Sequence, residues 1–234
     1  MKLQKQYMEE PVSEERVIRT GIWYLAWRWI AIVCLTVTIH IMMSSWYWPD
    51  KHEHVHKILL SDMQILQTID YSHTAYHRAT AWAKDAFYWV FEASGFNGMI
   101  RAFSTPTGFN PPDTEVRKVI VHFWSEIQAS MYSVQIIGER SSVLFSTWPL
   151  VFIVSLIAVA DGWSSRWLRR AHGGRESAFL YHRLKRGIFL SIVLMWASYL
   201  LWPSTVDPRL VILPFLMLYA LTLRFTISYF KKYF

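Results

Sequence analysis

The sequence predicts an all-α membrane protein with four transmembrane helices, and three observations carry this prediction. First, 53% of the 234 residues are apolar and only 18% are charged, which lies outside ordinary soluble composition. Second, four segments are apolar enough to cross a bilayer. Third, many of the 13 tryptophans gather near the ends of these segments, as in the aromatic belts of membrane proteins.

The first predicted transmembrane helix comprises residues 21–48 and follows a polar tail, residues 1–20, with four basic and four acidic residues. Ser13 suits an N-cap, and Glu14 and Glu15 then lie in a first turn where acidic groups stabilise the helix dipole. A helix is therefore predicted to begin there and to run directly into the membrane. No cleavage site for a signal peptide follows it.

Residues 49–142 contain no apolar segment of spanning length and are predicted to form one helical region outside the membrane. Residues 55–91 contain few helix breakers, which predicts one amphipathic helical run there. Its apolar residues recur at helical spacing: Ile58, Leu59, Met63, Leu66 and Ile69. Turn-forming residues at 104–113 precede a second helix, predicted to begin near Asp113 or Thr114. The apolar line of this second helix runs from Val116 to Val134 and needs a partner, which predicts a helical hairpin.

The remaining spans are predicted at residues 143–161, 187–202 and 210–230, with a basic loop at 162–186, a turn at 203–209 and a tail at 231–234. The second span continues the preceding helix without a strong breaker, so Pro149 is expected to kink one long helix. In the turn, Asp207 is the predicted N-cap of the last span and Pro208 its first helical residue.

The basic loop sets the predicted orientation. Residues 161–186 carry seven Lys and Arg against Asp161 and Glu176. Short loops rich in Lys and Arg stay on the cytoplasmic side, so an even number of spans places both termini there as well. The protein is therefore predicted to lie in the inner membrane of a bacterium, with residues 49–142 in the periplasm.

No residue pattern points to catalysis or to a cofactor. His52, His54 and His56 are close in sequence, yet on a helix only the first and last share a face, so packing is preferred over metal binding. The glycine turn at 173–177 lacks the Lys-Ser/Thr pair of a P-loop. Neither a nucleophile with its base nor an ionisable group at the middle of a span is visible. The chain is predicted not to be an enzyme.

The loop is the one candidate site, interpreted as a cytoplasmic docking surface on a helix–glycine–helix hairpin. Its candidate residues are Asp161, Arg166, Arg169, Arg170, Arg175, Glu176, Tyr181 and His182. Such a surface suits anionic lipid headgroups, nucleic acid or an acidic protein face. Orientation of the chain in the membrane explains much of the same charge.

The same residues carry a family resemblance. The segments 159–162 and 173–177, Arg166, the pair Arg169 and Arg170, and the pair Tyr181 and His182 resemble the membrane-protein family of integrating conjugative elements. Arg140, Pro149 and the four-span plan agree with it. Where that family has an apolar pair after Asp-Gly, this chain has Trp163 and Ser164.

The resemblance implies a setting: proteins of that family are typically encoded beside the coupling ATPase of a conjugative type IV secretion system. The expected function is a non-enzymatic inner-membrane component that docks to or stabilises the coupling ATPase or the inner-membrane complex. The alternative is a small exclusion, immunity or transport protein that acts on its own. Expected partners are the bilayer and secretion subunits; direct contact with DNA is not expected, and anionic lipid and oligomerisation are left open.

Overall fold

The structure is a computed structural model that describes residues 14–48, 50, 52–70, 73–104, 114–172 and 178–230. The regular structure of these residues is helical, which confirms the predicted all-α class. The elements are α1 (Glu14–Trp46), α2 (His52–Ile69), α3 (Thr74–Phe87), the π-helix η1 (Tyr88–Glu92), α4 (Phe96–Ser104), α5 (Thr114–His122), α6 (Trp124–Ser146), α7 (Trp148–Ala171), α8 (Ala178–Leu201) and α9 (Pro208–Ser228).

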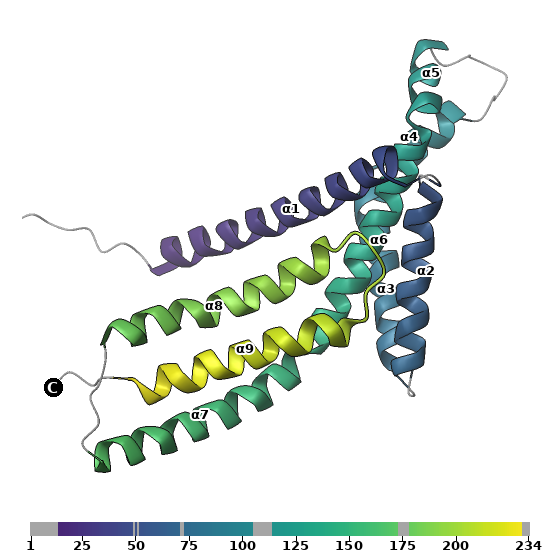
Figure 1. Cartoon of the computed structure of the whole chain (residues 1–234). Helices are drawn as coiled ribbons and strands as arrows, with labels where there is room; N and C mark the ends of the chain where they lie inside the picture. Colours follow the sequence, from purple (N-terminus) through teal and green to yellow (C-terminus); the bar gives the residue numbers. More distant parts are fainter. Residues whose placement is uncertain are drawn as a thin grey trace, which may run out of the picture.

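The helices form two groups that meet at one end (Figure 1). Helices α1, α7, α8 and α9 run side by side, while α2, α3 and α6 form a second bundle that crosses one end of this group. Three described helical segments are long and apolar enough to cross a membrane: Trp124–Ala171, Arg183–Leu201 and Pro208–Ser228. Helix α1 contains a shorter apolar stretch, Ile30–Met43. The first of the four predicted spans therefore stays a prediction.

The region between α1 and α6 differs from the predicted hairpin, because its first helix is divided into two. Helix α2 ends at Ile69, and α3 begins at Thr74. Asp70 makes the break, because its Oδ2 accepts a hydrogen bond from the Ala75 N–H at 2.6 Å. His73 adopts a left-handed backbone with φ of 54°. Neither signal is as visible in a sequence as a glycine or proline.

Helix α6 is the central element, since it contacts α1, α2, α3 and α8. Helix α5 begins at Thr114, as predicted. The prediction of one helix through Val134 is wrong, because a turn at Phe123 separates α5 from α6. Gly138 marks a close crossing with α3: a Cβ built there would lie 2.6 Å from the Trp82 carbonyl oxygen. The helix hairpin is therefore a three-helix bundle of α2, α3 and α6.

The predicted bend before the second span is found, and it lies at Thr147. This single turn residue separates α6 from α7, and Pro149 lies in the first turn of α7. A proline is tolerated there because the first N–H groups of a helix have no intrahelical acceptor. Helix α7 then continues to Ala171 through the first half of the predicted loop, as expected for a helix–glycine–helix hairpin.

The turn before α9 matches its prediction. Asp207 caps the helix by accepting the Arg209 N–H at 2.9 Å, and Pro208 is the first helical residue. Beside this turn, α6, α8 and α9 share an apolar core made of Leu144, Met195, Tyr199, Leu200 and Ile212. The ends of α8 and α9 are therefore packed against the end of α6.

Candidate functional site

The basic segment between α7 and α8 was the predicted site, and Arg169 in it contacts the end of α9. Its Nη2 donates to the Ser228 hydroxyl at 2.7 Å and its Nη1 to the Ser228 carbonyl at 3.2 Å. The guanidinium also lies over the Tyr229 ring, 3.9 Å from the centroid. A cation at a helix C-terminus pairs with unsatisfied carbonyls and with the negative end of the helix dipole. Arg169 thus caps α9.

Arg166 and Asp161 also contact α9 or the residues that follow it. Arg166 is buried, with its guanidinium 5.2 Å from the centroid of the Phe230 ring. Asp161 forms an ion pair with Arg224. Gly162 lets the two helices approach, because a Cβ there would lie 2.6 Å from the Arg224 carbonyl oxygen. Three of the predicted docking residues therefore hold α7 against the C-terminal part of the chain.

The other predicted residues are placed differently. The Tyr181 ring meets the Phe230 ring edge-on at 5.6 Å. Arg175 and Glu176, and the side chain of His182, lie outside the described residues. The exposed cations at this end of the bundle are Arg170, Arg183, Lys185 and Arg186, which we call the basic surface. Docking through the residues predicted for it stays a prediction.

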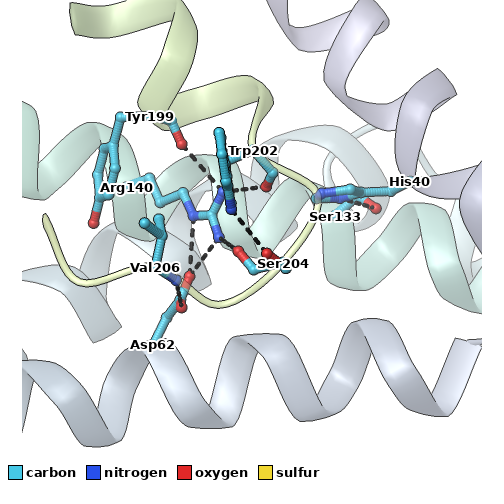
Figure 2. A network of polar contacts seen from close by, with 8 residues as sticks. All are labelled: His40, Asp62, Ser133, Arg140, Tyr199, Trp202, Ser204 and Val206. Atoms are coloured by element: carbon cyan, nitrogen blue, oxygen red, sulfur yellow. Dashed lines mark hydrogen bonds and ion pairs between the residues drawn. The ribbon is translucent and has the colours of Figure 1, made fainter. Parts of the chain in front are cut away.

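A second polar site was not predicted: a buried cluster of Asp62, Glu139 and Arg140 where the two helix groups meet. Figure 2 shows Asp62 and Arg140 with their polar contacts. Arg140 has no solvent exposure. Its Nε and Nη2 donate to Asp62 Oδ2 at 3.0 and 2.7 Å, so α6 and α2 are joined by a two-point ion pair.

Arg140 also holds the connection between α8 and α9. Its Nη1 donates to the carbonyl oxygens of Tyr199 and Trp202, at 3.1 and 2.6 Å, and its Nη2 donates to that of Ser204 at 2.8 Å. Asp62 contributes from the other side, because its Oδ1 accepts the Val206 N–H at 3.3 Å. The carbonyls at the end of α8 lack intrahelical partners, and the guanidinium satisfies them.

Formation of the cluster also has a free-energy cost, because it buries carboxyl groups. Glu139 is fully buried, and neither carboxyl oxygen has a hydrogen-bond partner within the described part of the chain. Burying a carboxyl group without such a partner is unfavourable. Burial also raises the pKa of Asp62, against the opposing charge and hydrogen bonds of Arg140. The three residues therefore depend on one another's charge.

Histidines make further contacts around α6. His40 Nδ1 lies 2.9 Å from the Ser133 hydroxyl, which joins α1 to α6. The predicted trio has separate neighbours: His52 Nδ1 lies 3.1 Å from the Ser125 hydroxyl, and the rings of His54 and His56 stack on Trp48 and Tyr132. Among the described residues, no group of three potential ligands is arranged to hold a metal ion.

One sequence signal could have found the buried cluster. Glu139 and Arg140 are the only charged residues between Glu126 and Asp161. Two adjacent charges inside an apolar stretch of that length imply a buried polar partner. The identity of that partner could not be read, because Asp62 lies far away in sequence.

The three described helical segments of spanning length and apolar composition are typical of a helical membrane protein. The chain belongs to the DtrJ-like family of IncC plasmid conjugative DNA transfer proteins, whose model matches residues 47–231. No curated protein and no solved structure matches the chain. The family implies a role in conjugative DNA transfer, which confirms that part of the predicted setting. The link to integrating elements and to a coupling ATPase stays a prediction.

Proposed function

We propose that this protein is a non-enzymatic inner-membrane component of a conjugative DNA-transfer machine. In this proposal α1, α7, α8 and α9 are the four spans, both termini are cytoplasmic, and α2 to α6 form a periplasmic bundle. The family supports the role in transfer, and the long apolar helices support the membrane location. The side-by-side arrangement of α1 with α7, α8 and α9 supports the assignment of α1 as a span in addition to those three.

The proposed activity is docking of the basic surface to an acidic face of the coupling ATPase or of another inner-membrane secretion subunit. The observation that carries it is that some cations of this segment are bound within the chain and others are exposed. Arg166 and Arg169 are fixed against the C-terminal part of the chain, while Lys185 and Arg186 are exposed. Helix α8, which carries Lys185 and Arg186, packs along α9, and the end of α9 is fastened to α7 by Arg169. The exposed cations therefore lie on an ordered support, which lowers the entropic cost of binding.

The test is the double variant Lys185→Gln/Arg186→Gln, expressed in donor cells that lack the native protein. We expect a fall in transfer frequency of about tenfold or more, as for a loss of about 1.4 kcal/mol of binding free energy. We also expect less coupling ATPase in a mild-detergent pull-down. The matched control is Arg117→Gln/Lys118→Gln on α5, which removes the same charge at the opposite end of the molecule (Figure 1).

Two readouts keep the result interpretable. Removal of loop cations can change orientation in the membrane, so accessibility labelling of the C-terminus must show an unchanged topology. Unchanged transfer and pull-down in a correctly inserted variant would refute docking through the basic surface. If the protein acts only when expressed in recipient cells, where it blocks entry of a second element, the exclusion alternative is correct instead.

A further inference from the structure

Helix α3 and the π-helix η1 present a second, aromatic face that none of the contacts above explains. Their inner face packs on α6 through Ala79 and Ala83, which are buried. Outward lie Tyr88, Trp89 and Val90, with Trp89 71% exposed. Isolated exposed apolar residues are ordinary on a protein surface, but a contiguous group marks an interaction site.

This aromatic face is continuous with the surface of a span. The Trp82 ring lies 5.6 Å from the Phe145 ring, at the end of α6. Three residues after Phe145, α7 begins with the half-exposed Trp148, and the outward residues of α7 are large and apolar. Arg78, one turn before Trp82, donates to the Ser146 hydroxyl at 3.0 Å. An arginine and tryptophans at the end of a span are typical of the headgroup level of a membrane.

A groove runs along this face between α1, α3–η1 and α6. Its volume is about 370 Å³, and its apolar walls include Val33, Trp82, Trp89, Val90, Val134 and Ile137. Asp85 and Ser141 are the polar residues among those that line it. The groove is predominantly apolar, which suits an alkyl chain.

The distance of the groove below the membrane surface follows from its α1 wall. Ile32, next to Val33, packs against the core that contains Met195 and Tyr199 near the end of α8. The helix rises roughly 9 Å from Met195 to its last residue, Leu201, at about 1.5 Å per residue. Amphipathic helices that lie on membranes bury their apolar face to about the same depth, roughly 5–10 Å.

We propose that α3–η1 lies at the periplasmic surface of the inner membrane. The groove there binds an acyl chain of a phospholipid, whose phosphate faces Arg78. The inference rests on the proposed membrane placement of the spans, but not on any docking partner. Lipid is the occupant because the groove is open beside the surface of a span. In addition, Arg78 lies where the headgroup would be, and the tryptophans of the groove wall lie where the acyl chain would follow.

The test measures the surroundings of single spin labels on the full chain in phosphatidylethanolamine–phosphatidylglycerol vesicles, with Cys34→Ser as the background. Val90→Cys is the test position. Phe152→Cys, on an exposed site within α7, is the control for insertion, and Leu60→Cys, on an exposed site of α2, is the control for water. The readout is the ratio of collisions with oxygen, which concentrates in lipid, to collisions with a water-soluble nickel chelate.

We expect the ratio at Val90 to resemble that at Phe152 and to exceed that at Leu60 by about tenfold, as for a free-energy difference of about 1.4 kcal/mol. A ratio like that of Leu60 would overturn the inference. Protection from both probes would overturn it too, because a second copy or a partner helix would then cover the face. A water-like ratio at Phe152 would instead contradict the membrane placement itself. Native mass spectrometry adds a measure of occupancy: Ile137→Phe, which fills the groove, should carry fewer bound phospholipids than wild type.

Discussion

Replacement of Arg140 by methionine is expected to be among the most destabilising single changes in this protein. The variant loses five hydrogen bonds: two to Asp62 and three to the carbonyls of Tyr199, Trp202 and Ser204. It also leaves the Asp62 carboxylate buried without its counter-charge. Removal of one partner from a buried ion pair typically costs about 3–5 kcal/mol of unfolding free energy. We expect Arg140→Met to fall in that range.

The assay is reversible unfolding of the purified chain in mixed micelles of dodecyl maltoside and SDS, followed by circular dichroism. Two further variants sharpen it. In the double variant Asp62→Leu/Arg140→Met no buried charge is left from the ion pair, so its cost should be well below the sum of the two single changes. Lys57→Met breaks the exposed ion pair between Lys57 and Asp50, and exposed pairs contribute little. Equal, small effects for Arg140→Met and Lys57→Met would refute the role of the cluster.

The pH dependence of the same variant gives an independent check. Burial raises the pKa of Asp62, and without Arg140 little opposes that effect. A carboxyl group with a raised pKa binds more protons in the folded state, so its contribution is fully present below the unfolded pKa of about 3.9. That contribution is then lost as the pH rises through the folded pKa. The deficit of Arg140→Met relative to wild type should therefore grow between pH 4 and pH 8, and a constant deficit would contradict this account.

Three further changes test the helix contacts in the same unfolding assay. Gly138→Ala and Gly162→Ala each place a Cβ 2.6 Å from a backbone oxygen, so each should cost about 1–3 kcal/mol. The control is Gly98→Ala, with nothing within 4 Å of the new Cβ, which should be neutral or stabilising; equal effects at all three glycines would argue against close packing. Arg169→Met should cost about 1–3 kcal/mol by uncapping α9, and an unchanged stability would show that Ser228 does not need it.

The local features of the fold were predictable from the sequence. The start of α5 at Thr114 and the Asp207 cap depend on residues close in the chain, and these were found as predicted. The end of α2 was missed because its cause is a carboxylate that bonds to a backbone N–H five residues later, with no glycine or proline. Asp occurs too often inside helices to be a breaker signal by itself.

The long-range polar contacts were not predictable. Arg140 and Asp62 are 78 residues apart, and Arg169 and Ser228 are 59 apart. Nothing in either local sequence indicates which partner will be met, because the pairing depends on how the helices pack. The basic segment was read as one surface for the same reason. Charge alone does not show which arginines are bound within the chain and which are exposed.

The two polar sites together explain how α9 is held. At one end, Asp62 accepts the Val206 N–H just before the helix, and Arg140 binds the Ser204 carbonyl. At the other end, Arg169 binds Ser228. Inside a membrane, apolar contacts alone give helices little reason to choose one neighbour, since lipid tails are equally apolar. Polar contacts at both ends fix the position of α9 relative to α6 and α7, and so connect the bundle that carries the aromatic face to the end that carries the basic surface.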